Sequence, residues 1–267
     1  MNPAEKPLSG RRIVLTRTRE QSSVLATRIA GLGATVIELP VLRISKAIPK
    51  DTLADVMLEL GTYDWIVFTS GNGVYHFFEE FFRLFDDIRA LGGMRIACVG
   101  DGTGRGIEEL HLKIECRPAR QTADALAEAL IATGSLDNAK VLVITGNLNR
   151  DTLVTKLEGA RAIVDQLPVY QTEKIDTAAL PEAADYRKKG ADAVLFASSS
   201  SAQFFSEQAA GLALAPDARR PLLGSMGPQT SATMRKCGMT VDFEANPPGF
   251  DAFIEALIKR LGAGAAR

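Results

Sequence analysis

Short runs of apolar residues alternate along the chain with longer segments in which apolar residues recur every three or four positions. The short runs are rich in Val and Ile and nearly unbroken by polar residues, as is typical of parallel strands that are covered on both faces. The pattern predicts strands at residues 12–16, 34–39, 64–69, 95–100, 113–117, 140–145, 161–167, 192–197, 221–227 and 240–244.

The longer segments are predicted helices. In 20–33 the apolar residues follow helical spacing, and Gly33 is expected to end the helix. In 122–134, Thr122 is the expected N-cap and Gly134 the expected stop. Ten strands with helices between them predict two five-stranded α/β units.

The chain also repeats itself. The tripeptide Leu-Pro-Val at 39–41 returns at 167–169, an interval of 128 residues. The same register extends over several blocks: 13–42 aligns with 141–170, 63–78 with 191–206 and, after one deletion, 100–103 with 227–230 and 125–130 with 252–257. A register held this far predicts an internal duplication into two domains of similar size.

Two prolines mark the joints between these domains. Pro40 and Pro168 each close a predicted strand and favour an extended conformation for the residue before them. An extended segment follows each joint, at 41–46 and at 168–174. The chain therefore either divides once near residue 140, or leaves the first domain at the first joint and returns to it at the second; the pattern does not choose.

Composition and charge exclude several classes of protein. With 46% hydrophobic and 24% charged residues and a formal net charge of −1, the chain is globular and has no overall field to recruit nucleic acid or an anionic membrane. The polar N-terminus indicates no signal peptide, and no apolar run is long enough to span a membrane. Three scattered cysteines (Cys98, Cys116, Cys237) indicate reduced thiols in a cytoplasmic protein. The two histidines, His76 and His111, form no metal-ligand spacing.

Two common catalytic motifs are absent. The segment GDGTGRG at 100–106 has Arg105 where a dinucleotide-binding G-x-G-x-x-G needs its third glycine. The segment FTSGNG at 68–73 lacks the G-x-S-x-G frame of a serine hydrolase, and no histidine is placed as its base.

The order and spacing of several segments resemble the uroporphyrinogen-III synthases over roughly residues 10–260. These segments are ELPVLRI, YDWIVFTSGNGV, RIACVGDGT, VLVITGNLNRDTL, LPVYQT, LFASSSSA and GSMGPQTSATMRKCG. The resemblance implies an α/β fold of two flavodoxin-like parallel-sheet domains, related by internal duplication and joined by a two-stranded linker. It places 1–40 and 175–267 in the first domain, 47–167 in the second, and 41–46 and 168–174 in the linker.

By the same resemblance the chain is a lyase that closes the linear tetrapyrrole hydroxymethylbilane into uroporphyrinogen III. The hydroxyl on ring A leaves as water, and ring D is inverted through a spiro intermediate. No metal or organic cofactor is implied. We expect a cytoplasmic monomer that has no nucleic-acid or membrane partner and that takes its substrate from hydroxymethylbilane synthase in a transient hand-off.

Such a substrate carries eight carboxylates, which a chain of net charge −1 must bind with local fields. Loops rich in Gly, Ser, Thr and Asn follow five predicted strands, where helix N-termini offer free N–H groups, and two such rims facing each other would form a cleft. The candidate substrate-binding residues are Arg17, Ser70, Gly100, Thr103, Gly146, Asn147, Asn149, Ser198, Gly227 and Thr230, with Arg150 as a further cation.

Each candidate has a second interpretation. Ser70, Thr103, Ser198 and Thr230 are more typical of helix N-caps than of substrate contacts, although a cap residue can do both. The arginines are equally typical of solvated surface residues. Gly100 and Gly227 precede helices and are expected to make tight turns in either case.

Tyr170 is the candidate catalytic residue. It lies in the second linker segment, where the family has a tyrosine associated with departure of the hydroxyl, and its phenol can donate a proton to the leaving water. The alternative is a tyrosine that only packs between domains. Its repeat partner is Leu42, so the hydroxyl belongs to one copy only.

Two non-catalytic functions compete with this hypothesis. A tetrapyrrole- or anion-binding sensor on the same fold would be favoured by an attached signalling segment, which the sequence lacks. A periplasmic solute receptor would be expected to carry a signal peptide and more cleft aromatics than this chain, which has one tryptophan.

Overall fold

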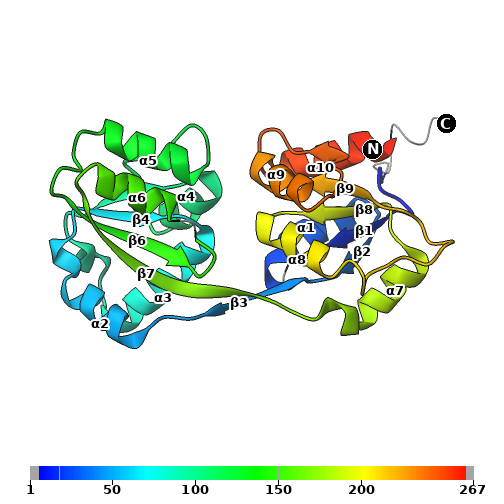
Figure 1. Ribbon diagram of the computed structural model, residues 1–267, viewed down its shortest axis with the longest axis horizontal. Helices are drawn as coiled ribbons and strands as arrows, with labels where there is room; N and C mark the ends of the chain where they lie inside the picture. The colour runs from blue at the N-terminus through cyan, green and yellow to red at the C-terminus, as the bar shows by residue number, and fades with distance from the viewer. Residues whose placement is uncertain (1–5, 18, 150, 263–267) are drawn as a thin grey trace, which may run out of the picture. The chain divides into compact units, whose positions relative to one another are not determined.

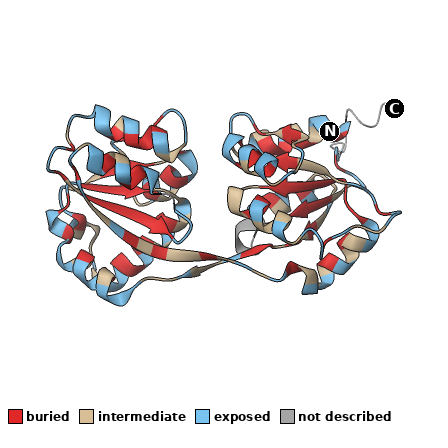
Figure 2. Cartoon of the chain, in the orientation of Figure 1, coloured by how far each residue is buried: buried red, intermediate tan, exposed pale blue. Residues whose placement is uncertain are grey.

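The computed structural model describes residues 6–17, 19–149 and 151–262, and it divides the chain into two compact units. The terminal unit comprises Met1–Arg43 and Glu173–Arg267, and the central unit comprises Ile44–Thr172. Each unit contains one five-stranded sheet covered by helices on both faces (Figure 1). The strands are the most buried part of each unit, and the helices have one buried and one exposed side (Figure 2).

The terminal unit has the sheet order β10-β9-β8-β1-β2, with all pairs parallel. Numbered within the unit this is the 2-1-3-4-5 order of flavodoxin-like folds. Its elements are β1 (Arg12–Leu15), α1 (Arg19–Gly31), β2 (Thr35–Glu38), a 3-10 helix (Thr177–Ala179), α7 (Pro181–Lys189), β8 (Ala193–Phe196), α8 (Ser199–Glu207), β9 (Leu222–Ser225), α9 (Pro228–Lys236), β10 (Phe243–Glu244) and α10 (Phe250–Gly262).

The central unit has the sheet order β3-β7-β6-β4-β5. Its elements are β3 (Leu42–Lys46), α2 (Lys50–Leu58), a 3-10 helix (Leu60–Thr62), β4 (Trp65–Phe68), α3 (Gly71–Leu84), a 3-10 helix (Ile88–Leu91), β5 (Arg95–Cys98), α4 (Asp101–Glu108), α5 (Ala123–Ala132), β6 (Lys140–Gly146), α6 (Thr152–Gly159) and β7 (Ile163–Lys174). Helices α2, α3 and α4 cover one face of this sheet, and α5 and α6 cover the other.

Most of the predicted strands are confirmed, but the strand at 113–117 is wrong. Only Cys116 pairs there, in an isolated bridge with Ala97. Pro118 follows closely and has no N–H to continue a ladder, while the Arg117 side chain turns to Asp101 on α4, 3.1 Å away. The fifth place in the central sheet is taken by the linker strand β3 instead. Hydrogen bonds from Ala47 to Val169 and from Ile175 to Val41 make β3 antiparallel to β7, so this sheet is mixed.

The duplication is visible in the backbone itself. Helix stops at Gly33 and Gly134 are confirmed, both with positive φ. Among the described residues, positive φ also occurs at the non-glycine positions His111 (59°), Asn138 (57°) and Arg161 (69°). In the repeat alignment their partners are Gly238 (74°), Gly10 (70°) and Gly33 (96°). Both copies thus keep a left-handed turn at the same place, whichever residue occupies it.

Both sheets also begin with the same carboxylate contact. Asp192, just before β8, accepts the N–H of Arg12 on β1 at 2.8 Å, and its repeat partner Asp64 accepts the N–H of Lys140 on β6 at 2.9 Å. Asp192 is buried and also receives guanidinium hydrogen bonds from Arg11 (3.0 Å) and from Arg219 (2.6 Å). Asp64 is exposed. Burial alone would raise the pKa of Asp192, but these hydrogen bonds outweigh it and lower the pKa.

We expect Asp192→Asn to lower the free energy of unfolding by about 2 kcal/mol, because two guanidinium groups lose their buried carboxylate, and Asp64→Asn to lower it by less than about 0.5 kcal/mol. Both asparagines still accept the strand N–H, so the pair isolates the charge. Because the pKa of Asp192 is lowered, its contribution is present above about pH 4 and disappears as the pH falls through the folded-state pKa. Urea unfolding of both variants between pH 3 and 7 measures this; equal losses at pH 7 would contradict it.

Candidate active site

The turn from β4 into α3 carries the first site residue. Ser70 has extended backbone angles and its Oγ accepts the N–H of Gly73 at 3.0 Å, so it is the N-cap of α3. The capping interpretation is therefore confirmed for Ser70. Its hydroxyl oxygen lies at the positive end of the helix dipole, on the edge where the parallel strands of the central sheet end.

A register shift between β6 and β7 positions Tyr170. Thr145 pairs with Pro168, but the next residue, Gly146, pairs with Tyr170, which leaves Val169 as an extra residue. In a regular strand, side chains alternate between the faces, so Tyr170 would point away from Val169. With the extra residue, both Tyr170 and Val169 pack on the cluster under α2 and α3. The bulge therefore turns the tyrosine to the α3 side of the sheet, where Ser70 lies.

Gly146 is needed where the tyrosine ring approaches the backbone of β6. A Cβ atom added to Gly146 would lie 2.4 Å from Cζ of Tyr170, far inside van der Waals contact. The ring therefore lies directly against the glycine backbone, and no other residue fits at position 146 without moving it.

Ser70 and Tyr170 are joined through their hydroxyls, with an Oγ–OH distance of 3.0 Å. Burial raises the pKa of Tyr170, and the hydrogen bond with Ser70 opposes this only in part. The phenol is consequently protonated at neutral pH and can act as a hydrogen-bond or proton donor. The structure thus brings together Ser70, Gly146 and Tyr170, three residues that the sequence had singled out separately.

Sequence reasoning missed His76 at this place. Its ring, on α3, stacks against that of Tyr170 with centroids 6.2 Å apart and planes 29° apart. Its Nδ1 lies 3.4 Å from an Oε of Glu79, and its side chain is only 14% exposed. No sequence pattern predicts this contact, because it depends on the register of β7 against β6. From the sequence, the histidines were considered only as metal ligands or as the base of a serine hydrolase.

The two asparagines after β6 differ in their contacts. Nδ2 of Asn147 donates to the carbonyl of Thr172 at 3.1 Å, and its Oδ1 accepts the N–H of Thr172 at 2.7 Å. Asn147 therefore continues the β6–β7 ladder with its side chain and has both amide groups engaged. Asn149 is exposed in the following turn. Arg150 lies outside the described residues.

The glycine–threonine pairs at the starts of α4 and α9 behave alike. Gly100 and Gly227, not the threonines, are the N-caps; Thr103 and Thr230 are buried in the first helical turn, so the capping interpretation is wrong for them. Both glycines lie in the bend between a strand and a helix, as expected, with extended backbone angles. The reason for glycine is close approach: an added Cβ would lie 2.4 Å from Gln121 at Gly100 and 3.0 Å from Pro248 at Gly227.

In the terminal unit, Ser198 caps α8 in a capping box with Ser201. Arg17 follows β1, partly buried, with its guanidinium 5.9 Å above the ring of Phe250. Burial lowers the pKa of Arg17, yet no carboxylate of the described residues pairs with it. A guanidinium stays charged at any physiological pH, so Arg17 places a positive charge at this edge of the sheet.

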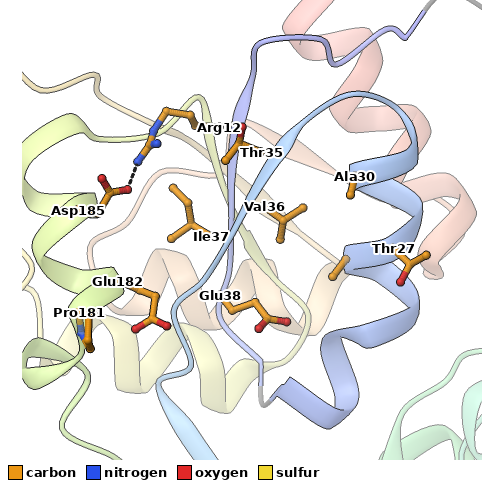
Figure 3. Close-up of a pocket in the computed structure, with 11 residues that line it drawn as sticks. Arg12, Thr27, Ala30, Thr35, Val36, Ile37, Glu38, Pro181, Glu182 and Asp185 are labelled. Carbon is orange, nitrogen blue, oxygen red and sulfur yellow. Dashed lines mark hydrogen bonds and ion pairs between the residues drawn. The ribbon is translucent and has the colours of Figure 1, made fainter.

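A cavity of about 700 Å³ lies elsewhere in the terminal unit (Figure 3). It runs along β2 between α1 and α7, and its wall includes the Arg12–Asp185 ion pair. None of the residues singled out from the sequence lines it. In the part of the chain that the structure describes, no three His, Cys, Asp or Glu side chains gather as a metal ion would require, and no helix is long and apolar enough to cross a membrane.

Similar proteins agree on one family. A family model described as uroporphyrinogen-III synthase HemD matches residues 23–255. The chain is 27% identical over 265 residues to a uroporphyrinogen-III synthase of Synechococcus elongatus, covering 95% of this chain and 97% of that protein. It is 29% identical over 176 residues to a porphyrin biosynthesis protein HemD of Ruminiclostridium josui, covering 64% of this chain but only 34% of that longer protein.

Solved structures share the fold. A mutant uroporphyrinogen III synthase of Thermus thermophilus superposes with a TM-score of 0.68 at 18% identity, covering 95% of this chain and all of that one. A uroporphyrinogen-III synthetase of Helicobacter pylori superposes with a TM-score of 0.61 at 16% identity, covering 93% and 99%. Because the family model matches most of the chain, the chain belongs to the uroporphyrinogen-III synthase family, a family of cyclising lyases in porphyrin biosynthesis.

Proposed function

We propose that this uroporphyrinogen-III synthase carries out its acid step at the carboxyl edge of the central sheet, with Tyr170 as the proton donor. The enzyme closes hydroxymethylbilane into uroporphyrinogen III with loss of water and inversion of ring D. The observation that carries the proposal is the partly buried phenol of Tyr170, held by Ser70 at 3.0 Å with its pKa raised.

The proton balance is simple. The C–O bond of the ring A hydroxymethyl group breaks, the Tyr170 proton moves to the leaving oxygen, and water departs. The bilane becomes a cationic azafulvene, which the substituted α-carbon of ring D attacks to form a C–C bond in a spiro intermediate. The bond from that carbon to the ring C methylene then breaks and leaves a second azafulvene cation on ring C. The free α-carbon of ring D attacks this methylene, which inverts the ring, and then loses its proton. One proton is released when the pyrroles regain aromaticity, and it restores the phenol.

Ser70 supports this role by orienting the phenol. Its oxygen already accepts the N–H of Gly73, and its own proton can be donated to the oxygen of Tyr170. Tyr170 then keeps its proton for the substrate. In this proposal Ser70 acts on Tyr170 rather than on a carboxylate.

Carboxylate binding is assigned to the helix starts at both sheet edges. In the central unit α3 and α4 begin side by side, since a Cβ on Gly71 would lie 3.6 Å from the carbonyl of Gly102. In the terminal unit Oγ of Ser199 on α8 donates to the carbonyl of Gln229 on α9 at 3.3 Å. Paired helix N-termini, with Arg17 in the terminal unit, suit a substrate of eight carboxylates. Holding rings A and D in place then supplies most of the rate.

The acid step is assigned to one copy of the repeat. The position of Tyr170 is occupied by the buried Leu42 in the terminal unit, and Ser198, the partner of Ser70, hydrogen-bonds within its own helix start. The cytoplasmic location, the monomeric state and the hand-off from hydroxymethylbilane synthase remain predictions.

The test of function is a coupled assay. Hydroxymethylbilane is generated from porphobilinogen by a separate deaminase, the protein is added, and the oxidised porphyrin isomers are separated by chromatography. Mostly type III porphyrin is expected. Type I alone from a folded protein would exclude the enzyme and leave a binding or sensor module.

Tyr170→Phe is expected to lower kcat about tenfold rather than abolish it, because positioning remains when the acid is lost. Tyr75→Phe is the matched control, since Tyr75 is 66% exposed on α3. Steady-state rates of type III formation measure both variants. A complete loss in Tyr170→Phe with the fold intact would contradict the geometric account.

Gly146→Ala is expected to lower both stability and kcat, the latter about tenfold, because the new methyl group displaces the Tyr170 ring. Gly159→Ala on α6 is the control, as a Cβ there meets nothing within 4 Å. Adding Tyr170→Leu to Gly146→Ala should restore the free energy of unfolding but not the activity. Full activity of Gly146→Ala would show that the ring position does not matter.

The pH dependence follows from the raised pKa of Tyr170. A raised pKa keeps the phenol protonated beyond its ordinary value of about 10, so its contribution persists through neutral and mildly alkaline pH. The ratio of wild-type to Tyr170→Phe kcat should therefore be constant between pH 7 and about 9.5. A ratio that falls with a midpoint near pH 8 would mean that the phenol ionises too early to be the acid.

A further inference from the structure

The mechanism so far leaves one group beside Tyr170 unused. His76 lies in the second turn of α3 with its side chain largely buried, and its ring stacks on the phenol ring at a centroid distance of 6.2 Å. It hydrogen-bonds to neither hydroxyl of the Ser70–Tyr170 pair among the contacts of the described residues.

We propose that His76 is a positioning residue that sets the plane of the Tyr170 ring and thereby aims its hydroxyl at the leaving group. The inference rests on the proposed function of Tyr170. His76 acts through the ring of Tyr170 and takes no proton in the reaction.

Three contacts restrict different movements of the Tyr170 side chain. Ser70 holds the hydroxyl oxygen, and Gly146 lets the ring lie against the backbone of β6. A single hydrogen bond to the oxygen does not fix rotation about the long axis of the ring, because the oxygen lies on that axis, and the glycine backbone contacts one side of the ring only. The stacked imidazole restricts this rotation and so sets the plane of the ring, in which the phenolic O–H lies.

Further contacts hold the imidazole itself. Nδ1 of His76 faces an Oε of Glu79 at 3.4 Å, and the same oxygen lies 3.4 Å from Nζ of Lys46 at the end of β3. Lys46 also contacts the buried carboxylate of Glu80, which accepts from Nε of Arg83 at 2.8 Å. The ring of His76 is thus fixed to a charged network that joins α3 to β3. A second aromatic ring, that of Tyr75, meets it edge-on at 5.0 Å.

The repeat supplies a comparison. Phe204 stands at the position of His76 in the terminal copy, where Leu42 replaces the tyrosine. A phenyl ring is therefore accommodated at this position of the fold, and His76→Phe is a suitable conservative variant that keeps a flat ring but loses Nδ1.

The experiment combines kinetics with a spectroscopic signal. His76→Ala and His76→Phe are made in the wild-type chain and in Tyr170→Phe, and kcat and KM for type III formation are measured. Phe82→Ala is the packing control, because Phe82 lies on the same helix, is 44% exposed and contacts other phenylalanines rather than Tyr170. Tyrosines labelled with carbon-13 at Cζ report the ring; the chain has four, and the signal of Tyr170 is the one lost in Tyr170→Phe.

We expect His76→Ala to lower kcat about fivefold with little change in KM, and His76→Phe to stay within about twofold of wild type. In the Tyr170→Phe background, His76→Ala should change kcat by less than about twofold, because the group it positions is gone. The Tyr170 resonance should shift in His76→Ala and much less in His76→Phe or Phe82→Ala.

Three results would overturn the inference: an equal loss from His76→Ala with and without the Tyr170 hydroxyl, a loss in His76→Phe as large as in His76→Ala, or an unmoved Tyr170 resonance. They differ from failure of the proposed function. If Tyr170→Phe retains full kcat while His76→Ala loses activity, the acid role of Tyr170 fails first. If the wild-type chain forms only type I porphyrin, the enzyme assignment itself fails.

Discussion

One extra residue in β7 decides where the phenol of Tyr170, the proposed proton donor, lies. Because Val169 has no partner on β6, the alternation of side chains slips by one, and Tyr170 turns to the face that α3 covers. Without the slip the phenol would lie on the α5–α6 face of the sheet, away from Ser70 and His76. Pro168 stands at the start of the slip and cannot donate a ladder hydrogen bond, which makes an irregular register inexpensive there.

The two copies of the duplicated fold carry different side chains at the ends of their strands. Both copies cap one helix with a serine, Ser70 after β4 and Ser198 after β8, and both begin the following helix at a glycine with an extended backbone. Only the central copy combines the capping serine with a phenol and a glycine that admits it. The terminal copy instead presents Arg17, a cation without a carboxylate partner in the described chain. The proposed function accordingly assigns acid chemistry to the central copy and anion binding to both.

The sequence pattern predicted the architecture well because its signals are local. Apolar runs identified nearly all strands, and the offset of 128 residues identified their pairing between copies. The segment 113–117 misled because apolar composition says nothing about whether Pro118 will end the pairing after one bridge. The site was harder, since its geometry depends on contacts between distant segments. Ser70 and Tyr170 were each predictable as chemical groups, but their 3.0 Å contact needs the β7 bulge, which no pattern revealed. Asn147 looked like a ligand donor and proved to complete a ladder with Thr172.

The left-handed turns shared by the two copies are evidence of how the chain arose. At three places a glycine in one copy faces Asn, His or Arg in the other, with φ positive in both. The residue type differs between the copies at these places, but the sign of φ is the same. This is so although a non-glycine residue at positive φ lowers the stability of the fold by about 1 kcal/mol relative to glycine. The backbone conformation is thus conserved between the two copies where the amino-acid sequence is not. A comparison of the signs of φ can therefore reveal an internal duplication after sequence identity between the copies has been lost.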